Sequence, residues 1–250
     1  MLGESSLQGG AVVVSGAAGG IGEQIVRGAL EAGALVVASD IEEKALAEMR
    51  GRLRSAGSLV VHRGDASAPD ALLELESVVA ALPAPLRLWV NCAGIVRRAE
   101  AASFDPDVWD AVMAVNVRSA LLGAQAARRS FEGGGAIVNL SSIVTTKTMP
   151  GRAAYATSKA AIEQLTKQLA LEWGPEGVRV NAVAPGFILT PISHLYGAPQ
   201  EERSAVEKSI PLRRFGEARD VAELVLFLGT DAAAYLTGQT IAVDGGVSLS

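Results

Sequence analysis

Seven short runs of apolar, mostly β-branched residues recur along the chain, separated by longer segments with helical periodicity. The runs cover residues 11–15, 34–39, 58–63, 86–91, 136–141, 178–185 and 240–245. Each run is continuously apolar rather than alternating, which is typical of a strand buried on both faces of a sheet. The order of strands and helices predicts an α/β fold with a doubly wound, parallel, seven-stranded sheet, helices on both faces and right-handed crossovers.

Helix boundary signals agree with this interpretation. Asp105 and Pro106 predict a capping carboxylate and a first-turn proline at the start of one helix. Gly174 and Pro175 predict the end of the helix that begins near Tyr155. The 250 residues contain no linker, repeat or low-complexity tract, so we expect a single domain over residues 1–250.

Composition excludes several classes of protein. The net charge of −5 argues against a nucleic-acid-binding protein, which usually needs a basic face. Cys92 is the only cysteine, which is typical of a reducing compartment. His62 and His194 are far apart and have no cysteine partners, so no metal site is predicted. Without a signal-like leader or an apolar stretch of about 18 residues, we expect a cytoplasmic protein with no membrane contact.

The stretch SGAAGGIG follows the first predicted strand. Gly16, Gly20 and Gly22 are spaced G-x-x-x-G-x-G, not in the G-x-G-x-x-G pattern of the usual dinucleotide fingerprint. Such glycines can simply permit a tight turn. They can also let the backbone approach a pyrophosphate at the N-terminus of the next helix. The position after the first strand of an alternating fold favours nucleotide binding.

Asp40 ends the second predicted strand. A carboxylate there can accept hydrogen bonds from an adenosine ribose, and it would repel a 2′-phosphate. No Arg or Lys occurs in the glycine loop or at 39–43, and the nearest is Lys44. This pattern predicts NAD rather than NADP as cofactor. Asp40 could equally cap the helix that follows, and one side chain could serve both roles.

A serine, a tyrosine and a lysine form the candidate catalytic set. Ser142 follows the predicted strand 136–141, and Tyr155 and Lys159 are four residues apart in YATSK. Positions i and i+4 share one face of a helix, so both side chains can point toward Ser142. The alternative is a surface lysine packed beside a half-buried tyrosine.

Together these motifs resemble the short-chain dehydrogenase/reductase family over nearly the whole chain. Beside the loop Ser15–Gly22 and the Ser/Tyr/Lys set, further similar segments occur in the same order. They are VNCAG at 90–94, VNV with Asn116, APGFILTP at 184–191 and LTGQTIAVDGG at 236–246. The resemblance implies a Rossmann-like fold and hydride transfer between NAD(H) and a secondary alcohol or ketone.

Proton transfer in such a reaction needs a tuned acid/base. A tyrosine has an ordinary pKa of ~10, which a nearby Lys⁺ and a positive nicotinamide ring would lower. We therefore expect Tyr155 to be the general acid/base, with Lys159 lowering its pKa and binding the nicotinamide ribose. Ser142 would hold and polarise the substrate oxygen. Asn116, as the family implies, would help hold a water relay from Lys159; the alternative is a buried polar group with a local partner.

The resemblance also implies a set of cofactor-binding residues along the chain. They are Gly16, Gly20, Ile21, Gly22, Asp40, Ile41, Asp65, Ala66, Asn91, Ala93, Gly94, Tyr155, Lys159, Pro185, Gly186, Ile188 and Thr190. Asp65 would meet the adenine ring, although a helix-capping role is equally open. Cys92 stands where the family has a second asparagine, and we expect it to behave as a small buried hydrophobe rather than a redox group.

The family places a mobile substrate lid at about 190–212. His194, Leu195 and Tyr196 could line the pocket there, with ordinary loop packing as the alternative. Segments 94–98 and 210–216 resemble family members that act on sugar acids, such as gluconate and deoxygluconate dehydrogenases. Their substrate carboxylate could pair with a guanidinium, or these arginines could be solvated surface groups. The candidates are Arg97, Arg98 and Arg152.

Helices at 107–130 and 155–173 pack across subunits in this family, which implies a homotetramer. Two other functions compete with an NAD-linked dehydrogenase. One is an NADPH-dependent 3-oxoacyl thioester reductase, against which Asp40 argues. The other is a non-catalytic NAD-binding regulator on the same fold, against which the intact proton-transfer set argues.

Overall fold

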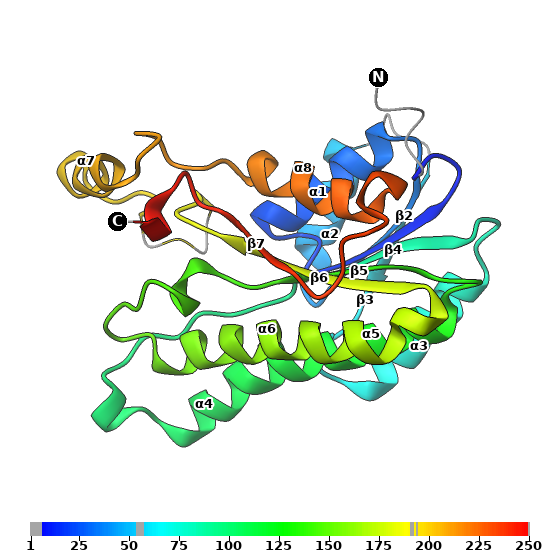
Figure 1. The fold of residues 1–250 in the computed structure, drawn as a ribbon, viewed down its shortest axis with the longest axis horizontal. Coiled ribbons are helices and arrows are strands. Elements are labelled where there is room, and N and C mark those ends of the chain that lie inside the picture. Colours follow the sequence, from blue (N-terminus) through cyan, green and yellow to red (C-terminus); the bar gives the residue numbers. More distant parts are fainter. Residues whose placement is uncertain (1–6, 54–57, 191–192, 194, 250) are drawn as a thin grey trace.

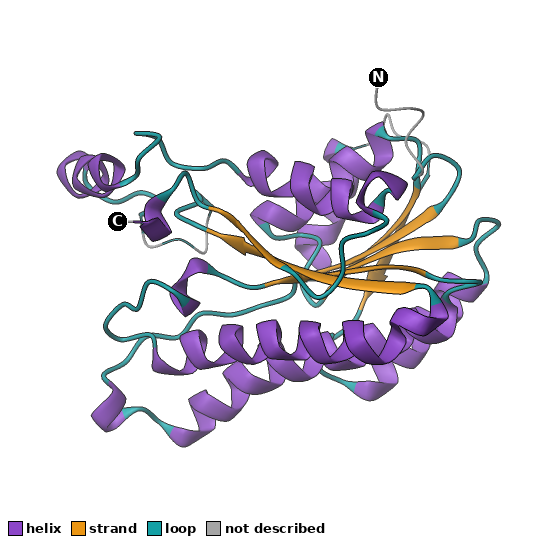
Figure 2. Cartoon of the chain, in the orientation of Figure 1, coloured by secondary structure: helices purple, strands orange, loops and turns teal. Residues whose placement is uncertain are grey.

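A computed structural model describes residues 7–53, 58–190, 193 and 195–249. In these residues seven parallel strands form one sheet in the order β3-β2-β1-β4-β5-β6-β7 (Figure 2). The strands are β1 (Ala11–Ser15), β2 (Leu35–Asp40), β3 (Leu59–Arg63), β4 (Leu86–Asn91), β5 (Gly135–Leu140), β6 (Val178–Pro185) and β7 (Thr240–Val243). The predicted doubly wound sheet in a single α/β domain is confirmed.

Helices cover both faces of the sheet (Figure 1). They are α1 (Gly20–Glu31), α2 (Glu43–Arg52), α3 (Pro69–Ala80), α4 (Pro106–Met113), α5 (Ser119–Ser130), α6 (Ala153–Trp173), α7 (Gln200–Ser209) and α8 (Ala218–Gly229). Figure 1 shows α1, α2 and α8 on one face, and α3, α4, α5 and α6 on the other. This division explains why each strand is continuously apolar, because neither face of the sheet is left to solvent.

Alternate residues of each strand enter two separate cores. In β1, Val12 and Val14 pack with α1 and α8, whereas Val13 packs with α3 and α5 on the opposite face. All three are fully buried. Burying a side chain of this kind contributes about 1.5–3 kcal/mol, so every strand has to satisfy both cores at once.

The predicted helix ends are also confirmed. Asp105 Oδ1 accepts a hydrogen bond from the Asp107 backbone N–H at 2.8 Å, and Pro106 is the first residue of α4. Helix α6 ends at Trp173, and Gly174 begins a short 3-10 turn. The predicted helix over 107–130 is interrupted, because a π-helical turn at Ala114–Arg118 joins α4 to α5.

The last strand is two residues shorter than the sequence predicts. The carboxylate of Asp244 accepts backbone hydrogen bonds from Gly246 and Ser248, both at 2.8 Å, and turns the chain away from the sheet. Gly245 follows with φ of +62°, a conformation that favours glycine.

The order of the strands determines where a ligand can bind. The neighbours β1 and β4 connect to strands on opposite sides, so their carboxyl ends open a crevice between diverging loops. Helix α7 lies apart from the two helical layers, near the C-terminus, and has no buried residue (Figure 1). Among the described helices, none combines the length and hydropathy that crossing a bilayer requires.

Candidate active site

A cavity of about 720 Å³ lies at the carboxyl ends of the strands. This volume is within the ordinary range for small-molecule and cofactor sites. The residues of the predicted site that line it are Gly16, Gly20, Ile21, Gly22, Asp40, Ile41, Asp65, Ala66, Ala93, Gly94, Ser142, Tyr155, Lys159, Pro185, Gly186, Ile188 and Thr190. The fold thus brings together segments from almost the whole length of the chain.

Glycines make the loop after β1 compact. Gly16 has φ of +65°, and a Cβ there would lie 2.6 Å from the backbone of Ala93, so only glycine fits. A Cβ at Gly22 would clash with the Gly16 carbonyl oxygen. Gly19, the N-cap of α1, has no side chain to cap the first N–H groups of the helix. The loop therefore presents bare backbone and a helix N-terminus to the cavity, which fits a pyrophosphate.

Asp40 is anchored from two sides at the end of β2. Its Oδ2 accepts a hydrogen bond from the Ala18 N–H at 2.9 Å, and its Oδ1 accepts one from Glu42 N–H at 3.1 Å. The N-cap of α2 is Glu42, so Asp40 braces the glycine loop rather than capping that helix. The nearby lining residues Glu42 and Asp65 are also acidic.

Asp65 belongs to the turn that follows β3. Its Oδ1 accepts hydrogen bonds from the backbone N–H and hydroxyl of Ser67, at 2.8 and 2.7 Å. The N-cap of α3 is Ala68, so Asp65 stabilises the turn before the helix and is not the helix cap itself. It also borders the cavity, where an adenine ring is expected.

Ser142, Tyr155 and Lys159 converge on the opposite part of the cavity. The hydroxyls of Tyr155 and Ser142 form a hydrogen bond. The Lys159 ammonium lies 5.7 Å from the centre of the Tyr155 ring and donates to the Leu140 carbonyl oxygen at 2.6 Å. Because Tyr155 and Lys159 are one turn apart on α6, the helix presents both to the end of β5.

Burial changes the acid–base properties of this group. It raises the pKa of Tyr155, while the hydrogen bond from Ser142 and the charge of Arg152 act in the opposite direction. Burial also lowers the pKa of Lys159 to about 8. The sequence predicted that Lys159 lowers the pKa of Tyr155. In the structure burial dominates instead, and the groups that counter it are Ser142 and Arg152.

The chain matches known proteins over its full extent. A family model described as Enoyl-(Acyl carrier protein) reductase matches residues 16–248. Galactitol 2-dehydrogenase (L-tagatose-forming) of Cereibacter sphaeroides is 38% identical over 97% of this chain and 96% of its own. The 3-oxoacyl-(acyl-carrier-protein) reductase of Thermotoga maritima is 36% identical over 96% and 98%. The chain belongs to the short-chain dehydrogenase/reductase family.

A solved structure supports the same assignment. The gluconate 5-dehydrogenase from Burkholderia cenocepacia J2315, in complex with NADP and tartrate, superposes with a TM-score of 0.91 and 31% identity. The alignment covers 98% of this chain and 97% of that one. This short-chain dehydrogenase/reductase is therefore an oxidoreductase of a family that uses a nicotinamide cofactor.

Asn116 lies on the π-helical turn and outside the cavity lining. Its Oδ1 accepts from the Ile95 N–H at 2.8 Å, and its Nδ2 donates to the Ile95 carbonyl oxygen and to Ser158 Oγ. A Cβ at Gly94 would lie 3.4 Å from Asn116 Oδ1 and 3.5 Å from Lys159 Nζ. Asn116 therefore has hydrogen-bond partners close by, as expected for a buried polar group without a catalytic role. It also borders the space beside the Lys159 ammonium.

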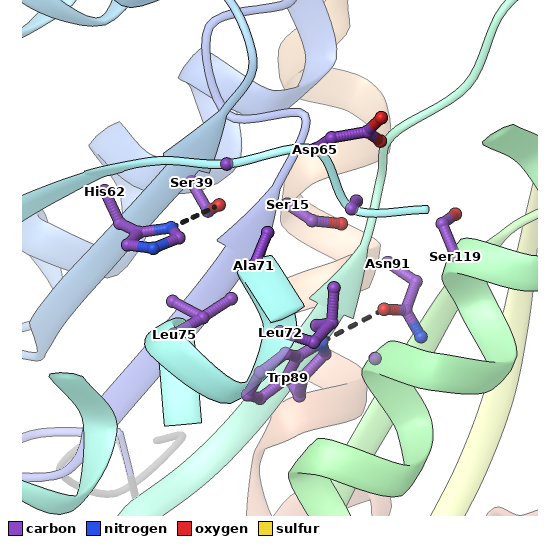
Figure 3. A pocket seen from close by; sticks show the side chains of 13 residues that line it. Ser15, Ser39, His62, Asp65, Ala71, Leu72, Leu75, Trp89, Asn91 and Ser119 are labelled. Atoms are coloured by element: carbon purple, nitrogen blue, oxygen red, sulfur yellow. Dashed lines mark hydrogen bonds between the residues drawn. The ribbon is translucent and has the colours of Figure 1, made fainter. Parts of the chain in front are cut away.

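Asn91, a member of the predicted cofactor set, does not line the large cavity, although the residues that follow it, Cys92 to Gly94, do. Its Oδ1 accepts from Trp89 Nε1 at 3.0 Å, and its Nδ2 donates to the Asn139 side chain at 2.9 Å. It lines a second, small cavity of about 10 Å³. Figure 3 shows its amide directed toward Trp89. The last residue of β4 faces the helical layer, so its amide joins β4 to β5.

The small cavity is also lined by a histidine of β3. His62 Nδ1 lies 3.1 Å from Ser39 Oγ, while its buried Nε2 has no protein partner among the described residues (Figure 3). Burial lowers the pKa of His62. The described residues hold no group of His, Cys, Asp and Glu side chains suited to a metal ion.

Cys92 fits the predicted role of a small hydrophobe. It packs against the core beside α1 and also lines the large cavity. Burial raises the pKa of its thiol to about 12, so the reactive thiolate is strongly disfavoured.

Apolar lining residues were missed from the sequence. Val115, Val144, Met149 and Phe187 border the cavity on the side of Ser142. Phe187 lies inside the motif at 184–191, which offered a signal for it. Val115 lies likewise inside VNV beside Asn116. Val144 and Met149 carry no motif, because ordinary apolar residues in turns acquire this role only through the fold.

Loop packing, rather than pocket lining, describes the residues predicted in the lid. Leu195 is fully buried in a third core cluster with Ile143, Ile210 and Phe215. Tyr196 is 62% exposed, and neither residue borders the cavity. His194 lies outside the described residues.

Replacing Lys159 by Met tests whether its charge is held at a cost to stability. A folded-state pKa of about 8, against 10.5 ordinarily, means that the folded protein binds this proton more weakly than the unfolded chain. Below pH 8 the buried charge therefore lowers the free energy of unfolding by about 3 kcal/mol, and this loss disappears as the pH rises to 10.5. Losing the bond to Leu140 costs about 1 kcal/mol at any pH. We expect Lys159→Met to be more stable than wild type at pH 7 but not at pH 10.5.

Denaturant unfolding at both pH values measures this difference. The exposed Lys167 on the same helix supplies a matched control, and Lys167→Met should show no pH-dependent gain. An equal stability difference at pH 7 and pH 10.5 would show that the Lys159 ammonium is not destabilised by burial.

Proposed function

We propose that this enzyme transfers a hydride between NAD(H) and a secondary alcohol or its ketone. The observation that carries the proposal is the meeting of Ser142, Tyr155 and Lys159 in the cavity that also receives the bare glycine loop. When bound, the nicotinamide supplies or accepts the hydride. The chain's own residues then have to orient the substrate oxygen and move one proton to or from it.

Tyr155 is the group suited to moving that proton. Its hydroxyl is already hydrogen-bonded to Ser142, so a substrate oxygen placed between them would contact both groups. Ser142 would orient and polarise that oxygen. Lys159 is a buried amine beside the tyrosine ring and lies where a nicotinamide ribose would bind.

NAD is the proposed cofactor rather than NADP. The basic residues that line the cavity are Arg97, Arg98, Arg152 and Lys159. None belongs to the glycine loop or to the ends of β2 and β3, where Asp40, Glu42 and Asp65 lie instead. A 2′-phosphate would meet these carboxylates there, and the nearby Arg63 at the end of β3 already pairs with Glu43 at 3.9 Å. The Burkholderia relative was captured with NADP, so the proposal rests on these residues and not on the family.

An anionic hydroxy compound is the proposed substrate, for example a sugar acid. Arg97, Arg98 and Arg152 line the cavity and pair with no carboxylate in the described part of the chain. Arg152 is half-buried, and burial together with the charge of Arg98 lowers its pKa. A substrate carboxylate would relieve this repulsion near Tyr155. The Burkholderia relative is a gluconate 5-dehydrogenase.

Initial rates with NAD⁺ and NADP⁺ test this function. The panel contains D-gluconate, the neutral polyol galactitol, 3-hydroxybutyryl-CoA and 2-butanol. We expect turnover of gluconate with NAD⁺. Turnover of the thioester with NADP⁺ alone would favour the rival reductase, to which the Thermotoga relative gives some support. No turnover with any pair, together with NADH binding, would favour the rival regulator.

Arg152→Gln tests the anionic substrate separately. Removing one charge-assisted contact should raise KM for gluconate about tenfold or more, with KM for a neutral polyol little changed. Because Arg152 also lowers the pKa of Tyr155, any change of kcat should be common to both substrates. Arg50, exposed on α2, provides the control Arg50→Gln, which should behave as wild type. Equal effects of Arg152→Gln on acidic and neutral substrates would contradict carboxylate recognition.

We further propose a homotetramer that packs through α5 and α6, as the family resemblance implies. The exposed apolar Leu171 on α6 supports a partner surface there. The cytoplasmic location stays a prediction from the sequence.

A further inference from the structure

One carboxylate on α6 holds the segment that carries Ser142. Glu163 Oε1 accepts hydrogen bonds from Ser141 Oγ and from Thr145 Oγ1, each at 2.8 Å. Glu163 follows Lys159 by four residues, so both side chains lie on the same face of the helix. Nothing in the proposed reaction uses Glu163, Ser141 or Thr145 directly.

These two contacts lie on either side of Ser142 in the chain. Ser141 precedes it and is buried, while Thr145 closes the 3-10 turn Ile143–Thr145 that follows it. The Thr145 hydroxyl also lies 2.9 Å from the Ser142 carbonyl oxygen. Ser142 Oγ itself accepts from the Val144 N–H at 3.3 Å and meets the Tyr155 hydroxyl. The backbone of Ser142 is therefore fixed from both directions while its hydroxyl faces the cavity.

Tyr155, Lys159 and Glu163 thus lie on successive turns of α6. Tyr155 meets Ser142, Lys159 donates to the Leu140 carbonyl oxygen at 2.6 Å, and Glu163 accepts from Ser141 and Thr145. The separation of Tyr155 and Ser142 depends on how α6 is fastened to the end of β5. Hydrogen bonds to a carboxylate are roughly twice as strong as those between neutral groups, which makes Glu163 an effective fastening point.

We propose that Glu163 is a positioning residue that holds Ser142 in the place where it and Tyr155 can share one substrate oxygen. This inference rests on the proposed function. Without the carboxylate, the Thr145 hydroxyl keeps only the Ser142 carbonyl oxygen, and the Ser141 hydroxyl keeps only the Lys159 carbonyl oxygen at 3.4 Å. The turn after β5 can then move relative to α6. Displacements of about 1 Å at a catalytic group can cost about 100-fold in rate.

Two substitutions at Glu163 separate its roles. Glu163→Gln keeps an Oε1 acceptor of the same shape, so we expect kcat to stay within a few-fold of wild type. Glu163→Ala removes the acceptor, and we expect kcat to fall about tenfold or more with KM for NAD⁺ unchanged. Glu31, exposed at the end of α1, provides the control Glu31→Ala, which should match wild type.

The pH dependence supplies a readout that a merely structural role would not change. Ser142 lowers the pKa of Tyr155, so a displaced Ser142 should move the rise of alcohol oxidation with pH to higher pH. Glu163→Ala should show this shift and Glu163→Gln should not. Combined with Ser142→Ala, Glu163→Ala should add little further loss, because both changes remove the same contact.

A cofactor-free measurement completes the test. Hydrogen exchange of residues 141–147 should become faster in Glu163→Ala and stay as in wild type in Glu163→Gln. If Glu163→Ala does not fold, Thr145→Val and Ser141→Ala remove the two donors one at a time and should each give a smaller loss of the same kind. Wild-type kinetics and exchange in Glu163→Ala, or an equal loss with and without Ser142, would overturn the inference. Absence of turnover in the wild type would instead contradict the proposed function.

Discussion

Tyr155→Phe is expected to reduce kcat by about 10²–10⁴-fold while leaving NADH binding within a few-fold of wild type. The substitution keeps the ring beside Lys159 and removes only the hydroxyl that meets Ser142. No other ionisable side chain that lines the cavity is held against Ser142 in this way, so nothing replaces the lost proton donor. Steady-state kinetics gives kcat, and fluorescence titration gives the affinity for NADH.

The controls for this prediction are available in the same chain. Tyr235 is fully exposed, and Tyr235→Phe should leave both kcat and affinity unchanged. Tyr155→Phe with near wild-type turnover would mean that another group moves the proton. A large loss of NADH affinity would mean that Tyr155 acts in binding instead.

Asp40→Asn is expected to lower the preference for NAD⁺ over NADP⁺ by about 100-fold or more in kcat/KM. A hydrogen bond to a charged group contributes about 1.5–3 kcal/mol, so losing the carboxylate should weaken NAD⁺ about tenfold or more. NADP⁺ should improve, because the repulsion of its 2′-phosphate is relieved. Asparagine is chosen because its remaining oxygen can still accept from the Ala18 N–H and brace the glycine loop.

Glu42→Gln is the matched control for this experiment. Glu42 is a neighbouring carboxylate on the cavity and is the N-cap of α2, without a side-chain capping bond. It should change the preference far less than Asp40→Asn. A cofactor ratio that Asp40→Asn leaves unaltered would exclude Asp40 as the residue that selects NAD.

Most of the fold could be predicted from local patterns. The predicted strand bounds lie within two residues of the observed ones. A run that is apolar at every position is buried on both faces of a sheet, so the ends of the run mark the ends of the strand. The helix ends at Asp105 and Trp173 followed from capping and breaking residues whose effect is steric and local. The π-helical turn at Ala114–Arg118 has no such local signal and was not predicted.

Residues of the site could be predicted only where they belong to a sequence motif whose chemical role is recognisable. Asn91 shows the limit, because the sequence gives its position at a strand end but not the face on which its amide lies. The structure directs it to Trp89 and Asn139, away from the cavity. Asn116 likewise found its partners in Ile95 and Ser158, which are 21 and 42 residues away.

Local sequence is enough to specify the order of strands and helices, the glycine loop and the spacing of Tyr155 and Lys159, since these depend on backbone sterics and on neighbours within one or two turns. Folding is what brings Glu163 against both sides of Ser142 and what buries Lys159, so that its pKa falls to about 8. Those properties arise from contacts and desolvation between segments far apart in the chain, and no local pattern encodes them.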